Sequence, residues 1–247
     1  MSAYNPTADS TSGQTTPKHW QNNTRHTKED ALTEREWELL WESAQSLDEP
    51  FALDAQLVVM VGGRLGLRAG EIAHLREEWV DWETDTIQIP HHDPCDFGRD
   101  GEVCGYCRQC AKQRVEHNDG DLSLDDALGM RWHPKTENSA REVPFGFSIR
   151  AKIILERYFD RYDRFKASRQ GVNRRVEAAA EGAADLDAAE IYPHCLRATC
   201  ASLAAGRGLE AFQLQQMLGW EDVRTAIKYV RTSGERTARA LDRIHNA

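Results

Sequence analysis

The sequence lacks any apolar run long enough to cross a membrane. Its longest run, Leu57–Val61, is far shorter than the roughly 20 residues that a transmembrane helix needs. The N-terminus also lacks the apolar segment that marks a signal peptide. From these absences we expect a soluble, cytoplasmic protein with no membrane partner.

Positive charge is also in short supply, since 31 Lys and Arg residues stand against 40 Asp and Glu residues and the net charge is −9. Such a balance argues against contact with nucleic acid unless basic residues gather locally. They do gather in the stretch Arg131–Arg175, which holds 12 basic and 5 acidic residues. A basic face on an otherwise acidic body is therefore expected, and it is compatible with DNA binding.

The chain is long enough for one folded domain, with 247 residues of which 40% are apolar. Residues 1–29 are rich in Ser, Thr, Asn and Gln, which predicts a disordered tail. Order is expected from the capping box at Thr33–Glu36, after which apolar residues recur at helical spacing. Thr86–Pro90 and Arg141–Phe145 have the character of strands. The pattern predicts a mainly α-helical α+β domain over residues 30–247.

Four of the six cysteines lie in an inserted segment, residues 91–128, which separates the two expected strands and could not pack a core of its own. They are Cys95, Cys104, Cys107 and Cys110, and His91 and His92 directly precede them. Clustered cysteines in a cytosolic chain disfavour disulfides, whereas four thiolates this close can surround Zn²⁺ tetrahedrally. We expect a structural zinc site without a part in the chemistry. The alternatives are an iron–sulfur cluster, four unliganded thiols, or a histidine in place of one cysteine.

Six residues elsewhere in the chain have, together, the chemistry needed to break a phosphodiester bond without a metal. A phenol can attack phosphorus, fixed cationic donors can hold the developing charge, and a lysine can protonate the departing alkoxide. The six are Arg68, Lys135, His194, Arg197, Trp220 and Tyr229. Singly, each has an ordinary structural explanation, such as a half-buried tyrosine on a helix. Together they point to one catalytic site.

The local contexts of these residues resemble those of the tyrosine recombinase, or phage integrase, family and its Xer-like members. Five motifs carry the resemblance: Gly66–Ile72, Lys135–Pro144, Pro193–Arg197, Leu218–Trp220 and Thr225–Val230. In the same order, they are similar to the family's first arginine box, its lysine-bearing β-hairpin, its second box, its His-or-Trp position and its nucleophile. The resemblance covers about Leu32–Ile244. It implies the family's catalytic domain, with a small antiparallel sheet that the Cys-rich segment interrupts.

The resemblance also implies a mechanism. Tyr229 would attack a backbone phosphate and form a 3′-phosphotyrosyl link, which a hydroxyl of a second strand reseals. Arg68 and Arg197 would hold the nonbridging oxygens, a task that suits planar bidentate donors. Lys135 would protonate the leaving 5′ oxygen.

Supporting roles follow from the same resemblance. His194 would orient the phosphate and assist proton transfer, and Trp220 would donate one N–H and shape the pocket. Glu71 would orient Arg68 or His194 by contacting that side chain and not the phosphate. We further expect contacts to double-stranded DNA from Arg131, Arg141, Arg174 and Arg175.

Two departures from the family pattern keep other functions open. Ala198 stands where the family usually has a second histidine. Only residues 1–29 precede the expected catalytic domain, so we expect the family's usual N-terminal core-binding domain to be absent. A non-catalytic accessory DNA-binding protein derived from an integrase is therefore an alternative, and a type IB topoisomerase is a related enzyme. A recombinase would work as a tetramer on DNA, with a partner that could supply the core-binding function.

Overall fold

The computed structural model describes residues 27–93, 95–118, 122–130 and 139–230. Their elements, in chain order, are η2 Thr27–Asp30, α1 Glu34–Gln45, α2 Phe51–Gly63, α3 Ala69–Ala73, η3 Glu77–Trp79, β1 Val80–Asp81, β2 Thr86–Ile89, η4 Arg99–Gly101, α4 Gly105–Glu116, α5 Leu124–Gly129, β3 Arg141–Pro144, α6 Ile149–Phe159, α7 Arg169–Glu181, η6 Ala188–Glu190, α8 Pro193–Gly206, α9 Ala211–Leu218 and α10 Val223–Ile227. Most of the tail predicted over residues 1–29 lies outside the described residues. Its last residues form the start of η2, which lies against α8.

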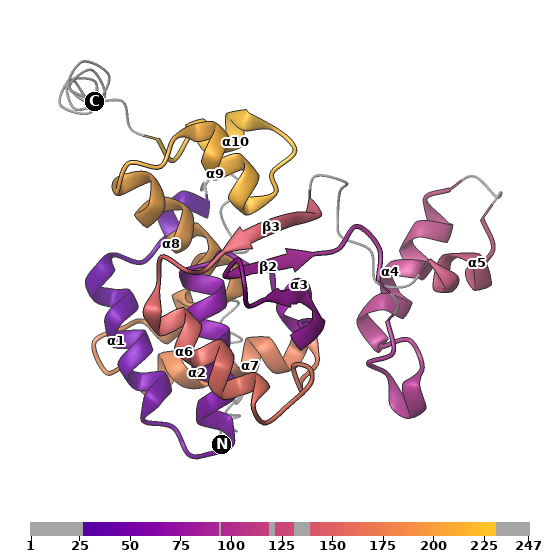
Figure 1. The fold of residues 1–247 in the computed structure, drawn as a ribbon, viewed down its shortest axis with the longest axis horizontal. Coiled ribbons are helices and arrows are strands. Elements are labelled where there is room, and N and C mark those ends of the chain that lie inside the picture. The colour runs from indigo at the N-terminus through magenta and orange to yellow at the C-terminus, as the bar shows by residue number, and fades with distance from the viewer. Residues whose placement is uncertain (1–26, 94, 119–121, 131–138, 231–247) are drawn as a thin grey trace, which may run out of the picture.

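Helix α2 is the centre of the fold because it is apolar on every side. Residues 52–63 are all buried, and α1, α6, α7 and α8 surround the helix (Figure 1). A helix that is hydrophobic all round is expected in the middle of a core rather than on a surface. Gly63 allows α1 to approach closely, since a Cβ there would clash with the indole nitrogen of Trp37.

Helix α1 begins where the sequence predicts it to begin. Thr33 and Glu36 form the expected capping box: the backbone N–H of Thr33 donates to the Glu36 carboxylate at 2.7 Å, and that of Glu36 donates to the Thr33 hydroxyl at 3.3 Å. Two of the donors that a helix start leaves unsatisfied are thereby paired. The helix then buries Trp37, Leu40 and Trp41 against α2 and α7.

The sheet is small and antiparallel, in the order β1-β2-β3, as predicted. Ile87 of β2 lies opposite Val143 of β3, and both side chains are fully buried. The predicted strands Thr86–Pro90 and Arg141–Phe145 are each confirmed to within one residue. Together with the many helices, this sheet confirms the predicted mainly α-helical α+β fold.

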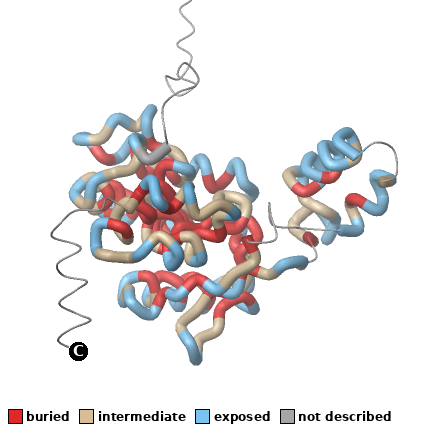
Figure 2. The backbone as a smooth tube through the Cα atoms, turned by 90° about the horizontal axis from the view of Figure 1, so that it is seen from above, coloured by how far each residue is buried: buried red, intermediate tan, exposed pale blue. Residues whose placement is uncertain are grey.

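The inserted segment forms an arm that projects from the body beside the sheet (Figures 1 and 2). Helices α4 and α5 pack mainly on each other. In the described part of residues 91–128, the buried residues are Cys95, Cys107, Ala111 and Ala127. Four small side chains do not make a core, so the arm depends on something else for its stability.

Among the described residues, no helix combines the length and the apolar character that crossing a membrane would require.

Candidate active site and metal centre

The buried carboxylate of Glu71, on the short helix α3, is the centre of an arginine cluster. It accepts hydrogen bonds from Nη1 of Arg68 at 2.8 Å and from Nη1 and Nη2 of Arg141 at 2.9 and 3.0 Å. Both arginines also reach backbone carbonyls of the α9 end: Arg68 donates to Gly219 and Arg141 to Met217, each at 2.7 Å. The cluster thus joins α3, β3 and the end of α9.

Burial raises the pKa of Glu71, but the charges of Arg141, Arg197 and Arg68 outweigh this and lower it to about 2. Glu71 is therefore ionised at neutral pH. It compensates part of the positive charge that the site gathers. The prediction that Glu71 orients Arg68 fits this geometry, and Arg141 is a second partner that the sequence did not suggest.

Arg197, on α8, is the most deeply buried arginine of the cluster, with 3% of its surface exposed. Its guanidinium donates to the carbonyl oxygens of Gly66 and Leu218. Burial and the nearby charge of Arg68 lower the pKa of Arg197 to about 9. A cation held this way is rigid and poorly solvated, which makes it ready to interact strongly with an anion.

Tyr229 and Trp220 lie next to each other, and Trp220 is close to Arg197. Their rings stack with centroids 5.3 Å apart and an interplanar angle of 19°. Cζ of Arg197 lies 5.9 Å from the centroid of the Trp220 ring, within range of a cation–π contact. A continuous path of contacts therefore runs from the arginine cluster through the indole to the phenol.

The two remaining predicted catalytic residues are His194 and Lys135. His194 is exposed in the first turn of α8, three positions before Arg197. Lys135 lies outside the described residues, as does Arg131.

The predicted DNA contacts divide into two kinds. Arg174 is exposed on α7, as a phosphate contact should be. Arg175 instead pairs with the buried Asp54 at 2.6 Å and covers the ring of Phe51. Arg141 is 4% exposed and belongs to the Glu71 cluster. Charged partners inside the protein hold the guanidiniums of these two arginines, and their contact with DNA stays a prediction.

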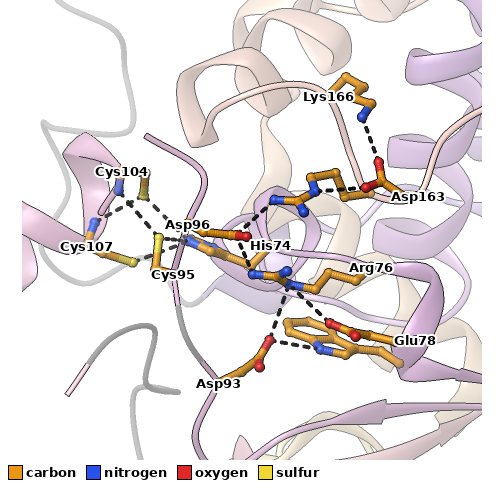
Figure 3. A network of polar contacts seen from close by, with 12 residues as sticks. His74, Arg76, Glu78, Asp93, Cys95, Asp96, Cys104, Cys107, Asp163 and Lys166 are labelled. Atoms are coloured by element: carbon orange, nitrogen blue, oxygen red, sulfur yellow. Dashed lines mark hydrogen bonds and ion pairs between the residues drawn. The ribbon is translucent and has the colours of Figure 1, made fainter. Parts of the chain in front are cut away.

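A group of metal-ligand side chains forms where the arm meets the body. Nε2 of His74 and the sulfurs of Cys95, Cys104 and Cys107 all lie within 4.8 Å of one another. Figure 3 shows the imidazole facing the three cysteines. The prediction named Cys110 as the fourth ligand, but Cys110 is exposed and outside this group, and His74 takes its place. The alternative of a histidine replacing one cysteine is the one that fits.

The spacing of these donors suits a tetrahedral metal ion. The three sulfurs lie 3.4, 3.5 and 3.3 Å from Nε2 of His74. Metal–sulfur and metal–nitrogen bonds of about 2.3 and 2.0 Å at the tetrahedral angle place such donors roughly 3.5 Å apart. Nδ1 of His74 lies 2.7 Å from the carbonyl oxygen of Gly70, an arrangement that orients many metal-binding histidines. The residues therefore fit a closed Cys₃His site.

The loop that carries Cys95 is tied to the body by its next two residues, of which Figure 3 labels Asp96. Asp96 accepts from Arg76 at 2.6 Å and from Arg164 at 2.9 Å. The ring of Phe97 contacts the same two guanidiniums, whose Cζ atoms lie 4.8 and 5.0 Å from its centroid. The ligand loop is thus docked independently of any ion.

Sequence reasoning missed His74, and the reason is its position. It follows Glu71 by three residues and precedes Cys95 by 21, so no local spacing links it to the cysteines. The one available signal was a histidine at the end of a short apolar helix.

The fold of the described residues resembles that of solved recombinases and of a transposon integrase. XerA recombinase is similar with a TM-score of 0.53 and 20% identity, over 88% of this chain and 65% of that one. A Tn1549 transposon integrase in complex with transposon right end DNA is similar with a TM-score of 0.57 and 16% identity, over 92% of this chain and 68% of that one. XerH site-specific recombinase bound to difH substrate is similar with a TM-score of 0.53 and 16% identity, over 86% of this chain and 53% of that one. At these identities the likeness shows the fold alone.

The family itself is shown by sequence. The model of the phage integrase family matches residues 30–236, so this chain belongs to that family. No curated protein matches the sequence. The chain spans slightly less than two thirds of the XerA recombinase chain and about half of the XerH chain.

Proposed function

We propose that this protein is a site-specific DNA recombinase that cleaves and rejoins DNA strands through a tyrosine. One observation carries the proposal: two fixed guanidiniums, an indole and a phenol of a phage integrase family chain gather at one place, through residues 68, 197, 220 and 229. Double-stranded DNA is the substrate. The DNA-bound state of similar solved structures supports this choice.

In the proposed reaction, the phenol oxygen of Tyr229 forms a bond to phosphorus and the bond from phosphorus to the 5′ oxygen breaks. The proton of Tyr229 passes to solvent with the assistance of His194, and Lys135 donates one to the leaving 5′ oxygen. Arg68 and Arg197 hold the nonbridging oxygens, where negative charge develops. His194 orients the phosphate. Attack by a 5′ hydroxyl on the phosphotyrosyl ester reverses the steps and rejoins a strand, so no external energy source is needed.

The burial of Arg197 supports its proposed role. A cation whose pKa is lowered by burial is stabilised when an anion arrives, because the phosphate supplies the charge partner that the protein withholds. Glu71 compensates part of the charge but faces Arg68 and Arg141. The site thus keeps net positive charge for a phosphodiester.

The experiment that tests the proposal detects a covalent protein–DNA adduct on a denaturing gel. The substrates are nicked duplexes that tile the DNA flanking the protein's own gene, since nicking traps the intermediate. An adduct with the natural protein and with Tyr162→Phe, but none with Tyr229→Phe, establishes the nucleophile. Intact DNA binding without an adduct would favour the alternative, a non-catalytic accessory protein. Relaxation of supercoiled plasmid without strand exchange would favour topoisomerase activity.

The metal of the Cys₃His group is proposed to be structural zinc. A closed set of three thiolates and one imidazole leaves no open position for a substrate, and soft thiolate ligands favour zinc over hard cations. Metal analysis of the purified chain tests this, with about one zinc per chain expected. A brown protein with iron and inorganic sulfide would instead indicate a cluster.

We further propose a cytoplasmic protein that acts as a tetramer on DNA. Strand exchange between two duplexes requires four cleavages, and each protomer supplies one tyrosine. A core-binding function would come from another polypeptide or a further region. Sizing of the protein with and without its site DNA tests the stoichiometry, and a monomer on cleaved DNA would contradict it.

A further inference from the structure

Helix α3 links the two groups described above. It has five residues, Ala69–Ala73, with Arg68 and Glu71 at its start and His74 at its end. A helix of this length has no stability of its own, because nucleation costs more than so few hydrogen bonds return. Its position is therefore set by its packing on α7 and α2, where Ile72 is buried, and by what holds its two ends.

The start of α3 is held by the arginine cluster. Arg68 donates to Gly219, and Glu71 binds Arg141, so the α9 end and β3 restrain this side. Each of these restraints is made by a charged side chain, which a DNA phosphate would perturb. A restraint at the other end of α3 would keep its position constant while a substrate anion enters and leaves.

The end of α3 is held by residues of the metal-ligand group and of α4. Nδ1 of His74 lies 2.7 Å from the carbonyl oxygen of Gly70, in the turn between Arg68 and Glu71. Tyr106, between two of the cysteines on α4, packs directly on that turn: a Cβ at residue 70 would lie 3.3 Å from its ring. The arm therefore touches α3 at the residue between the two active-site side chains.

We propose that a metal ion bound by His74, Cys95, Cys104 and Cys107 positions Arg68 and Glu71. His74 is thereby a positioning residue, and the inference rests on the proposed function of the arginine cluster. The physical link is the imidazole. When Nε2 is bound to a metal, the proton must sit on Nδ1, which then donates to Gly70. Without the ion the imidazole keeps its packing against Phe97 and Tyr106 but loses the bond that fixes its tautomer, and this restraint on α3 weakens.

The proposal predicts a local effect of the metal, not a global one. Helix α2 is buried on every side and does not depend on the arm. Helix α3 depends on it through His74 and Tyr106. Loss of the ion should therefore open α3 while the core stays folded.

Hydrogen exchange of the full chain tests this directly. The zinc-loaded protein is compared with Cys107→Ser, with protein stripped by a chelator, and with stripped protein refilled with Zn²⁺. Cys110→Ser is the matched control, since Cys110 lies on the same helix but outside the group. In both metal-free forms we expect at least tenfold faster exchange at the amides of Ile72, His74 and Leu75, and restoration on refilling.

Helix α2 amides distinguish the possible results. If they are unchanged while α3 exchanges faster, the inference holds. If α3 is equally protected with and without zinc, the ion does not position it and the inference fails. If α2 and α3 lose protection together, the ion stabilises the whole domain and not α3 in particular, which also overturns the inference.

Comparing DNA affinity with the rate of adduct formation tests the functional consequence. With the nicked duplex, we expect Cys107→Ser to bind DNA within about threefold of the natural affinity but to form adduct at least tenfold more slowly. Cys110→Ser should match the natural protein in both. Equal loss of binding and cleavage would contradict positioning. If no form makes an adduct, the proposed enzymatic function fails, whereas the exchange result still decides whether the metal fixes α3.

Discussion

The two ends of helix α3 contrast in how their groups are held. At the start, charges dominate: Glu71 neutralises part of the charge of Arg68 and Arg141, and every guanidinium has a protein acceptor. At the end, the donors of His74 and three cysteines are crowded around one point, and the group would be completed by an ion from solution. The comparison shows that one short helix can combine a site that is complete in the polypeptide with one that is not.

The largest expected effect is at the charged end. Arg68→Gln should slow adduct formation by roughly 10²–10³, the cost of removing one preorganised donor from a developing charge. Single-turnover cleavage of the nicked duplex measures it. Arg174→Gln, at an exposed position on α7, is the control and should leave the cleavage step unchanged at saturating DNA. Equal rates for Arg68→Gln and the natural protein would remove the arginine cluster from the mechanism.

Stability should also respond most strongly at the charged end. Glu71→Gln leaves buried guanidiniums without their carboxylate, and breaking such a buried pair costs about 3–5 kcal/mol. Urea unfolding measures the loss. Glu177→Gln, at an exposed site on α7, should change stability by less than about 0.5 kcal/mol. A neutral Glu71→Gln would mean that the arginines find other acceptors.

The same carboxylate gives the fold a defined acid response. Because the pKa of Glu71 is about 2 when folded and 4.5 ordinarily, the unfolded chain binds the proton first as pH falls. Its stabilisation, on the order of 3 kcal/mol, is complete above pH 4.5 and is lost as pH falls towards 2. The stability difference between the natural protein and Glu71→Gln should therefore shrink across that window. A difference independent of pH would contradict the assignment.

At the metal end, the docking of the ligand loop should tune metal affinity. Asp96→Asn weakens the contacts to Arg76 and Arg164, and changes of this kind behind a metal site typically cost about 10–100-fold in affinity. Competition with a zinc-binding dye measures it. Asp100→Asn, exposed in the same loop, should have no effect. Unchanged affinity in Asp96→Asn would show that the cysteines alone set the site.

The smallest effect separates two neighbouring arginines. Arg174→Ala should weaken DNA binding modestly and reduce the salt dependence of binding by about one counterion. Arg175→Ala should leave the salt dependence unchanged but lower stability, because Asp54 loses its buried partner. Titrations at several salt concentrations measure both. The reverse pattern would return Arg175 to the DNA interface.

How far the sequence reaches differs between the two ends of α3. The contexts of Arg68, Arg197 and Tyr229 indicated the family, and the strand pair and helix starts followed from local pattern. Such features depend on short segments, which sequence reasoning reads directly. What it missed needs contacts between distant segments. The pairing of Arg141 with Glu71 spans 70 positions, and that of Arg175 with Asp54 spans 121. Charge alone could not tell these arginines from surface ones.

His74 and Cys95 lie 21 positions apart, and β1 and β2 lie between them. A bound ion would therefore act as a cross-link that closes a ring around the first hairpin of the sheet. By the loop-entropy relation for cross-links, a ring of this size reduces the conformational entropy of the unfolded chain. This corresponds to a stabilisation of the folded state by about 3 kcal/mol. The ion would thus hold the two ends of this hairpin together. The insert, which supplies three of the four ligands, would then stabilise the strand pairing of the domain into which it was inserted.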